Sequence, residues 1–210
     1  MPPLIDLRVA ELLCARLCHE LVSPVGAINN GVELLSEEEP DFLKPDFLND
    51  AVALIGQSAR KAGQRLQFYR LAYGVSSAGG DPRELLAGLF EGGKVELDWH
   101  PEVAELPREW QILACNIAVI AAEALPRGGT VAVKPGAPSS GGGLAVTGTG
   151  EAVNLPEELG PGLGRKIAVA DLSARNVHPC FTACLAEALG ARVILKKVNA
   201  GSFVLTAGTG

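Results

Sequence analysis

The strongest constraint on the fold is a pair of long segments in which apolar residues recur every three or four positions, the period of an amphipathic helix. The first segment extends from Leu4 to about Ser36, and the second runs from Phe47 to Leu71. Each predicts a helix of about 30 residues, roughly 45 Å long at 1.5 Å per residue. Because only residues 37–46, which begin with the acidic stretch 37–41, separate them, we expect an antiparallel hairpin.

A hairpin of two helices cannot cover its own apolar stripe. In this chain the stripe consists of Leu13, Leu17, Leu21, Leu54, Ile55 and Leu66. Two hairpins that pair into a four-helix bundle would bury it, so the sequence predicts a homodimer with this stripe as its core. Pro24 falls inside the first helix and is expected to bend it, because its ring displaces a backbone hydrogen bond.

A change of composition at Val75–Gly80, a stretch of small residues, indicates a domain boundary. We therefore expect a helical hairpin over residues 1–77 and a second domain over residues 78–210. Asp81-Pro82 is typical of a helix start, with a helix through Phe90. Further helices are expected at 109–125 and 179–189, and strands at 94–99, 130–134, 144–147, 191–197 and 202–207. Helices on one side of a mixed sheet predict an α+β fold.

Length and charge narrow the class of protein. A chain of 210 residues with 48% hydrophobic and 20% charged residues can form a core without disulfides or metal. Its formal charge of −6 argues against a nucleic-acid or anionic-membrane partner, since both need a basic surface. The first residues lack the pattern of a secretory signal, and we find no apolar stretch long enough to span a membrane. These features predict a cytoplasmic protein.

The five cysteines are expected to be reduced core residues. They are Cys14, Cys18, Cys115, Cys180 and Cys184. The two outer pairs are four residues apart on expected helices, where a disulfide is geometrically awkward. Cys14, Cys18 and His19 do not predict a zinc site, because a fourth ligand is missing nearby and consecutive helical residues cannot both face one ion.

The segment whose side chains are best suited to carry out a reaction is Arg16–Pro24, with the sequence RLCHELVSP. Neutral imidazole is nucleophilic near pH 7, and its phosphoramidate passes readily to a carboxylate. His19 therefore fits a phosphoryl relay, with Glu20 available to hold one ring nitrogen protonated and Ser23 four residues on. A rigid helix is adequate, because phosphoryl transfer needs mainly in-line positioning and charge stabilisation. The local sequence leaves open that His19 is a partly buried helix histidine with Glu20 beside it by chance.

The motif His19-Glu20-Leu21-x-Ser23-Pro24 resembles the H-box of two-component histidine kinases. Residues 16–35 are similar to the ChpT family of alphaproteobacterial histidine phosphotransferases, with the sequence RLCHELVSPVGAINNGVELL. The resemblance implies a homodimer that moves a phosphoryl group from the receiver domain of a hybrid histidine kinase to response regulators. It also implies that His19 is the phosphoacceptor, that Glu20 is the adjacent acid or base, and that Ser23 occupies a position that influences dephosphorylation. Any Mg²⁺ is expected to come from the receiver.

The second half resembles the ATP-binding domain of those kinases in layout, but it departs from their nucleotide site. Ile120 occupies the place of the asparagine that holds Mg²⁺, and it cannot ligate a hard cation. Val146, in the sequence VTGTG, occupies the place of the aspartate that contacts adenine, and Asn176–Pro179 replaces the glycine-rich lid. We expect a degenerate domain that takes no cofactor and does not bind ATP. An ATP-dependent kinase with an atypical site and a non-catalytic dimeric scaffold that binds receivers remain alternatives.

A receiver is expected to dock on the helix flank around His19. Arg16, Val22 and Pro24 are the predicted partner-binding residues, with Arg16 meeting acidic residues around the receiver's metal site and Val22 giving apolar contact. Three other features are assigned structural roles. His100 and His178 each precede a proline at the edge of an expected element, so both are expected in surface turns. The segment 148–150 lacks the following helix and lysine of a phosphate loop and is expected to be a turn.

Overall fold

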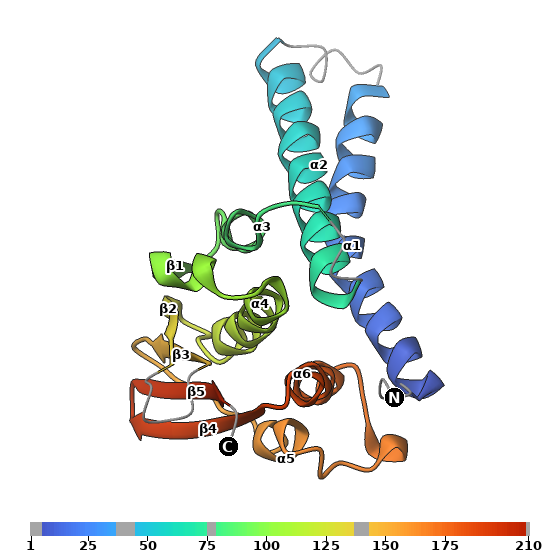
Figure 1. Ribbon diagram of the computed structural model, residues 1–210. Helices are drawn as coiled ribbons and strands as arrows, with labels where there is room; N and C mark the ends of the chain where they lie inside the picture. The colour runs from blue at the N-terminus through green and yellow to red at the C-terminus, as the bar shows by residue number, and fades with distance from the viewer. Residues whose placement is uncertain (1–5, 37–44, 75–78, 137–142, 209–210) are drawn as a thin grey trace.

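The computed structural model describes residues 6–36, 45–74, 79–136 and 143–208. A helical hairpin of α1 (Leu7–Ser36) and α2 (Pro45–Tyr73) extends from a mixed α/β half of the molecule, as Figure 1 shows. The side chain of Asp6 accepts a hydrogen bond of 2.8 Å from the backbone N–H of Arg8 and so caps the first turn of α1. The predicted hairpin is confirmed, with α1 beginning at Leu7 where the sequence predicted Leu4.

The two helices of the hairpin approach each other closely at Gly31. A Cβ atom on Gly31 would lie 2.5 Å from Cγ1 of Ile55, so a larger residue there would force the isoleucine side chain to shift. Ile55 therefore packs inside the hairpin of its own chain. Pro24 lies within α1, and Figure 1 shows that the two ends of this helix are inclined differently, in agreement with the predicted bend.

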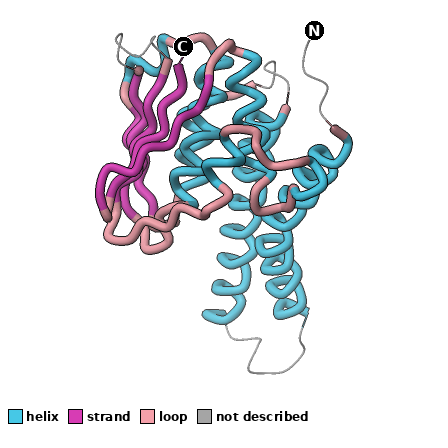
Figure 2. Tube along the Cα trace, turned by 90° about the horizontal axis from the view of Figure 1, so that it is seen from below, coloured by secondary structure: helices cyan, strands magenta, loops and turns pink. Residues whose placement is uncertain are grey.

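The second half consists of short helices and a five-stranded sheet. Its elements are α3 (Pro82–Phe90), β1 (Val95–Trp99), η1 (Pro101–Glu105), α4 (Arg108–Glu123), β2 (Gly129–Pro135), β3 (Leu144–Thr149), α5 (Leu159–Leu163), η3 (Val169–Asp171), α6 (Val177–Ala188), β4 (Arg192–Asn199) and β5 (Ser202–Gly208). The strand order is β1-β2-β3-β5-β4, with β1 parallel to β2 and the other neighbours antiparallel. Helices cover one face of the sheet (Figure 2). The predicted α+β fold is confirmed.

Local signals account for the ends of several elements. The carboxylate of Asp81 accepts hydrogen bonds from the backbone N–H groups of Arg83 (2.7 Å) and Glu84 (3.3 Å), which confirms the predicted cap of α3. The predicted turn at 148–150 is wrong, because residues 148 and 149 belong to β3. Gly148 pairs with Phe203 of β5, and a Cβ atom there would lie 2.3 Å from the phenyl ring. This glycine makes room for a core ring.

The main hydrophobic core joins the sheet, α4 and the base of the hairpin. Ten consecutive residues of α4, from Ile112 to Ala121, are buried. Phe68, Leu71 and Ala72 at the end of α2 belong to the same cluster. Residues 1–77 and 78–210 were predicted as separate domains, and the structure shows that these two parts of the chain share one core.

A second, smaller cluster attaches the start of α1 to α6. It contains Val9, Leu12 and Leu13 from α1, Leu172, and Val177, Cys180 and Phe181 from α6. The prediction that Leu13 belongs to a dimer core is wrong, since Leu13 is buried within its own chain. None of the described helices combines the length and hydropathy needed to cross a membrane.

Candidate functional site

His19 lies on an open flank of α1. Its side chain is exposed, as are those of Val22 and Ser23, which follow three and four residues later on the same helical face. The structure thus contradicts the alternative in which His19 is a partly buried helix histidine. Within the described part of the chain, no cluster of three or more metal-ligating side chains exists at this flank or elsewhere. What the flank offers is an accessible imidazole on a rigid helix.

Glu20 points toward α2 and not toward His19. Its carboxylate oxygen Oε2 lies 3.9 Å from Nη1 of Arg65, and the same nitrogen donates a hydrogen bond to the backbone carbonyl of Glu20. Among the described residues, His19 and Glu20 form no hydrogen bond with each other. Consecutive side chains on a helix do not face one another, which explains why the expected contact between the imidazole and Glu20 is not formed here.

Two of the predicted docking residues do not lie on the open flank. The side chain of Arg16 is only 11% exposed and forms an ion pair with Glu123 of α4. Its Nη1 also approaches the carbonyl oxygen of Ala174 at 3.5 Å. Pro24 is buried. The expectation that Arg16 and Pro24 face a receiver is therefore corrected, and Val22, with 69% of its surface exposed, is the predicted docking residue that lies open.

The two positions that resemble the nucleotide site of kinases in sequence hold apolar, buried side chains. Ile120 is 3% exposed and Val146 is fully buried. Ile120 forms one wall of a cavity of about 700 Å³, together with Glu123, Leu159 and Asn176. The cavity lies beside α4, and Ile120 lines it with a hydrocarbon side chain. Val146 is enclosed in the core.

A buried polar pair joins α2, α4 and α6. The side-chain nitrogen of Asn116 donates to the carbonyl oxygens of Ala72 (3.3 Å) and Ile112 (2.9 Å). This orientation leaves Oδ1 of Asn116 as the acceptor for Nε2–H of His178, 3.0 Å away. Burial, together with the nearby Arg16 charge, lowers the pKa of His178 to about 3, so the ring is neutral.

The surface-turn prediction for His178 is therefore wrong. Helix α6 begins at Val177, two residues before the expected Pro179, so His178 lies in the first helical turn and faces the core. His100 is different. Its ring is partly exposed, and Nδ1 accepts a hydrogen bond of 3.4 Å from the backbone N–H of Glu102 at the start of η1. The prediction of a surface turn agrees with this position.

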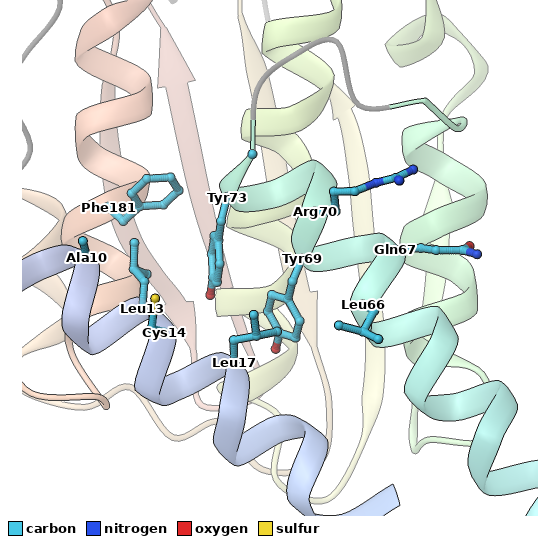
Figure 3. Close-up of a pocket in the computed structure, with 11 residues that line it drawn as sticks. Ala10, Leu13, Cys14, Leu17, Leu66, Gln67, Tyr69, Arg70, Tyr73 and Phe181 are labelled. Atoms are coloured by element: carbon cyan, nitrogen blue, oxygen red, sulfur yellow. The ribbon is translucent and has the colours of Figure 1, made fainter. Parts of the chain in front are cut away.

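A largely apolar pocket of about 640 Å³ lies between α1, α2 and α6, as Figure 3 shows. Leu17 and Leu66, two residues of the predicted dimer stripe, line it together with Tyr69 and Phe181. Other large apolar side chains are exposed along the hairpin: Val25, Val32, Leu35, Val52 and Leu54. A single chain leaves this face of the hairpin open to solvent.

The cysteines agree with only part of the prediction. All five are free thiols. Cys115 and Cys180 are buried core residues, and burial raises the pKa of the Cys115 thiol. Cys14 and Cys18 are exposed on α1, so the expectation that they belong to the core is wrong.

Comparison with known proteins identifies the class. A family model described as the histidine phosphotransferase C-terminal domain matches residues 79–201, and the chain belongs to this family of histidine phosphotransferases. The protein phosphotransferase ChpT of Brucella abortus (strain 2308) is 37% identical over 196 residues, which cover 89% of each chain. A solved bacterial phosphotransferase aligns over 99% of both chains with 32% identity and a TM-score of 0.77. The recognition of the family from the motif around His19 is confirmed.

Proposed function

We propose that His19 is the phosphoacceptor of this histidine phosphotransferase. In this proposal the protein takes a phosphoryl group from the receiver aspartate of a hybrid histidine kinase and passes it to the aspartates of response regulators. The observation that supports it best is the exposure of His19 on a flank of α1 shared with Val22 and Ser23. A receiver can reach this imidazole without any rearrangement of the chain.

The transfer step needs only an accessible neutral imidazole. The unprotonated ring nitrogen attacks the phosphorus of the aspartyl phosphate, the P–O bond to the carboxylate breaks, and an N–P bond forms. The aspartate leaves as a carboxylate, and the second transfer runs in the opposite sense onto another aspartate. Ser23 is proposed to influence dephosphorylation. The carboxylate of Glu20 faces Arg65 and not the imidazole, so Glu20 has no direct part in this step. Mg²⁺ belongs to the receiver in this scheme.

The assembly we propose is a cytoplasmic homodimer. The exposed apolar residues of α1 and α2, which include Val25, Val32 and Leu66, would be covered when two hairpins form a four-helix bundle. The receiver then docks over the free flank around Val22 and Ser23. The second half, attached to the hairpin through the shared core, supplies additional surface for the receiver.

The protein is proposed to act without ATP. The side chains of Ile120 and Val146 have no oxygen or nitrogen for a nucleotide or for Mg²⁺, and both are buried. This favours a relay over an ATP-dependent kinase. A scaffold that binds receivers without accepting phosphate is the remaining alternative, and only phosphorylation can separate it from the relay.

The test is transfer of label from a purified, ³²P-phosphorylated receiver. The wild-type chain and His100→Ala, a variant at a second histidine that solvent reaches, are expected to become labelled, whereas His19→Ala is not. Equal labelling of His19→Ala would overturn the assignment. Receiver binding without labelling of any variant would support the scaffold.

A further inference from the structure

Helix α1 has a gap in its backbone hydrogen bonds one residue after His19. In an α-helix the N–H of residue 24 would donate to the carbonyl of residue 20. Pro24 has no N–H, so the carbonyl of Glu20 loses its helical donor. This carbonyl lies in a part-buried position between the two helices of the hairpin, where an unpaired backbone group is costly.

Arg65 of α2 fills this gap. Its guanidinium Nη1 donates a hydrogen bond to the carbonyl oxygen of Glu20. The same nitrogen lies 3.9 Å from the carboxylate of Glu20. One side chain on α2 therefore contacts both the backbone and the side chain of the residue that follows His19. The planar guanidinium suits such a double contact, because it presents several N–H donors in a fixed fork.

The surroundings of Arg65 allow this contact to be specific. Its side chain is 31% exposed and that of Glu20 is 32% exposed, so solvent screens the pair only in part. Arg60, five residues earlier on α2, has the same charge but is exposed and forms no ion pair or hydrogen bond among the described residues. The two arginines therefore have the same side chain, but only Arg65 contacts Glu20.

We propose that Arg65 is a positioning residue for phosphoryl transfer, which fixes the turn of α1 that carries His19 by replacing the hydrogen bond lost at Pro24. The inference rests on the proposed role of His19. Arg65 does not touch the phosphoryl group. It acts through the backbone and carboxylate of Glu20, and so limits the directions in which the imidazole can point.

The physical reason is the precision that in-line transfer requires. The attacking nitrogen, the phosphorus and the leaving oxygen must be nearly collinear, and a displacement of about 1 Å can cost on the order of a hundredfold in rate. A helix is weakest where a proline interrupts its hydrogen bonds. Without Arg65, the turn around His19 would be free to move, while the exposed surface that the receiver contacts would be unchanged.

The experiment compares Arg65→Gln with the charge-matched control Arg60→Gln. Single-turnover transfer from a phosphorylated receiver is measured over a range of receiver concentrations. We expect Arg65→Gln to lower the maximal rate about tenfold and to leave the half-saturating concentration unchanged. Arg60→Gln should match the wild-type maximal rate. Arg65→Lys, which keeps one charged donor, should fall between Arg65→Gln and the wild type and is available if the glutamine variant does not fold.

The same Arg65 substitution in a Pro24→Ala protein tests whether Arg65 acts by replacing the lost hydrogen bond. Pro24→Ala restores a backbone N–H that can bond to the carbonyl of Glu20. The change Arg65→Gln should then cost less than twofold, against about tenfold in the wild-type background. Equal costs in the two backgrounds would overturn the inference, as would a full rate for Arg65→Gln alone. Failure of the wild-type chain to accept phosphate would instead overturn the proposed role of His19.

Discussion

His178 is a neutral imidazole enclosed between α2, α4 and α6, where its Nε2–H donates to Asn116. No local motif indicates this pair. His178 is expected outside α6 from the sequence, because the proline after it suggests a later helix start. Proline is tolerated in the first turn of a helix, so the proline did not mark the helix boundary. Only the packing of three helices reveals the contact.

The buried state of His178 predicts a pH dependence of stability. Its pKa is about 3 in the folded chain, against 6.5 for an unperturbed histidine. Between these pH values the histidine binds a proton in the unfolded chain but not in the folded chain. The contribution of His178 to the free energy of unfolding is therefore full above pH 6.5 and decreases as the pH falls. We expect a loss of about 2 kcal/mol from this residue between pH 7.5 and pH 5. Urea unfolding at the two pH values measures it.

A substitution at the same position is the control for this effect. His178→Gln should be less stable at pH 7.5 and should lose much less stability on acidification. If His178→Gln loses as much stability between the two pH values as the wild type does, His178 is not the titrating group.

At the scale of elements, the periodicity of the sequence predicted α1 to α4, α6 and the five strands with small shifts at their ends, but it did not predict α5, η1 or η3. It could not predict which face of α1 meets which neighbour. Leu13 and Arg16 lie on the part of α1 that packs against the second half. From the sequence, Leu13 was expected to contact a second copy of the chain and Arg16 to contact a receiver. The periodic pattern indicates that a stripe is apolar, but whether its own chain or a partner covers the stripe depends on the tertiary fold.

The ion pair between Arg16 and Glu123 is predicted to attach α1 to the second half. Arg16→Gln should lower the free energy of unfolding by about 1 kcal/mol, because Glu123 is nearly half exposed and solvent weakens the pair. Glu123→Gln should have a similar effect. In the double variant the two effects should not add, since the second change removes no further interaction. Additive losses in urea unfolding would show that the pair contributes nothing.

At the scale of the whole molecule, the hairpin emerges from the core of the second half, with its upper part free (Figure 1). The sequence predicted the two parts but not their union, because the residues that join them, such as Phe68 and Leu71, have the same apolar character as any helix stripe. The family was recognisable from the short motif around His19. Arg65 could not be identified in this way, since nothing in the sequence indicates which α2 side chain reaches the Glu20 carbonyl.

The proposed dimer makes a prediction about mass. Light scattering at micromolar concentration should give twice the mass of one chain, because the open apolar face of the hairpin is unfavourable in water. The double variant Val32→Asp/Leu66→Asp should shift the protein toward the monomer. Val22→Asp, at a still more exposed valine on the docking flank, should remain dimeric. A wild-type chain that is monomeric would contradict the bundle.

The second half is predicted not to bind ATP. A nucleotide facing Val146 would lack an acceptor for its adenine amine, at a cost of about 1–3 kcal/mol, and Ile120 would leave Mg²⁺ without a ligand. Together these effects should raise the dissociation constant for ATP about a thousandfold. Titration calorimetry with millimolar Mg-ATP should show no saturable heat. Binding with a dissociation constant below about 100 μM would support the kinase alternative instead.

The most direct test of the central claim is to locate the phosphoryl group. The protein is incubated with a phosphorylated receiver, digested under neutral to basic conditions that preserve phosphohistidine, and analysed by mass spectrometry. We predict that the added phosphoryl mass lies on His19, and that the modification is stable in base and lost in mild acid, as expected for a phosphoramidate. A phosphoryl group on any other residue, or an acid-stable modification, would contradict the account.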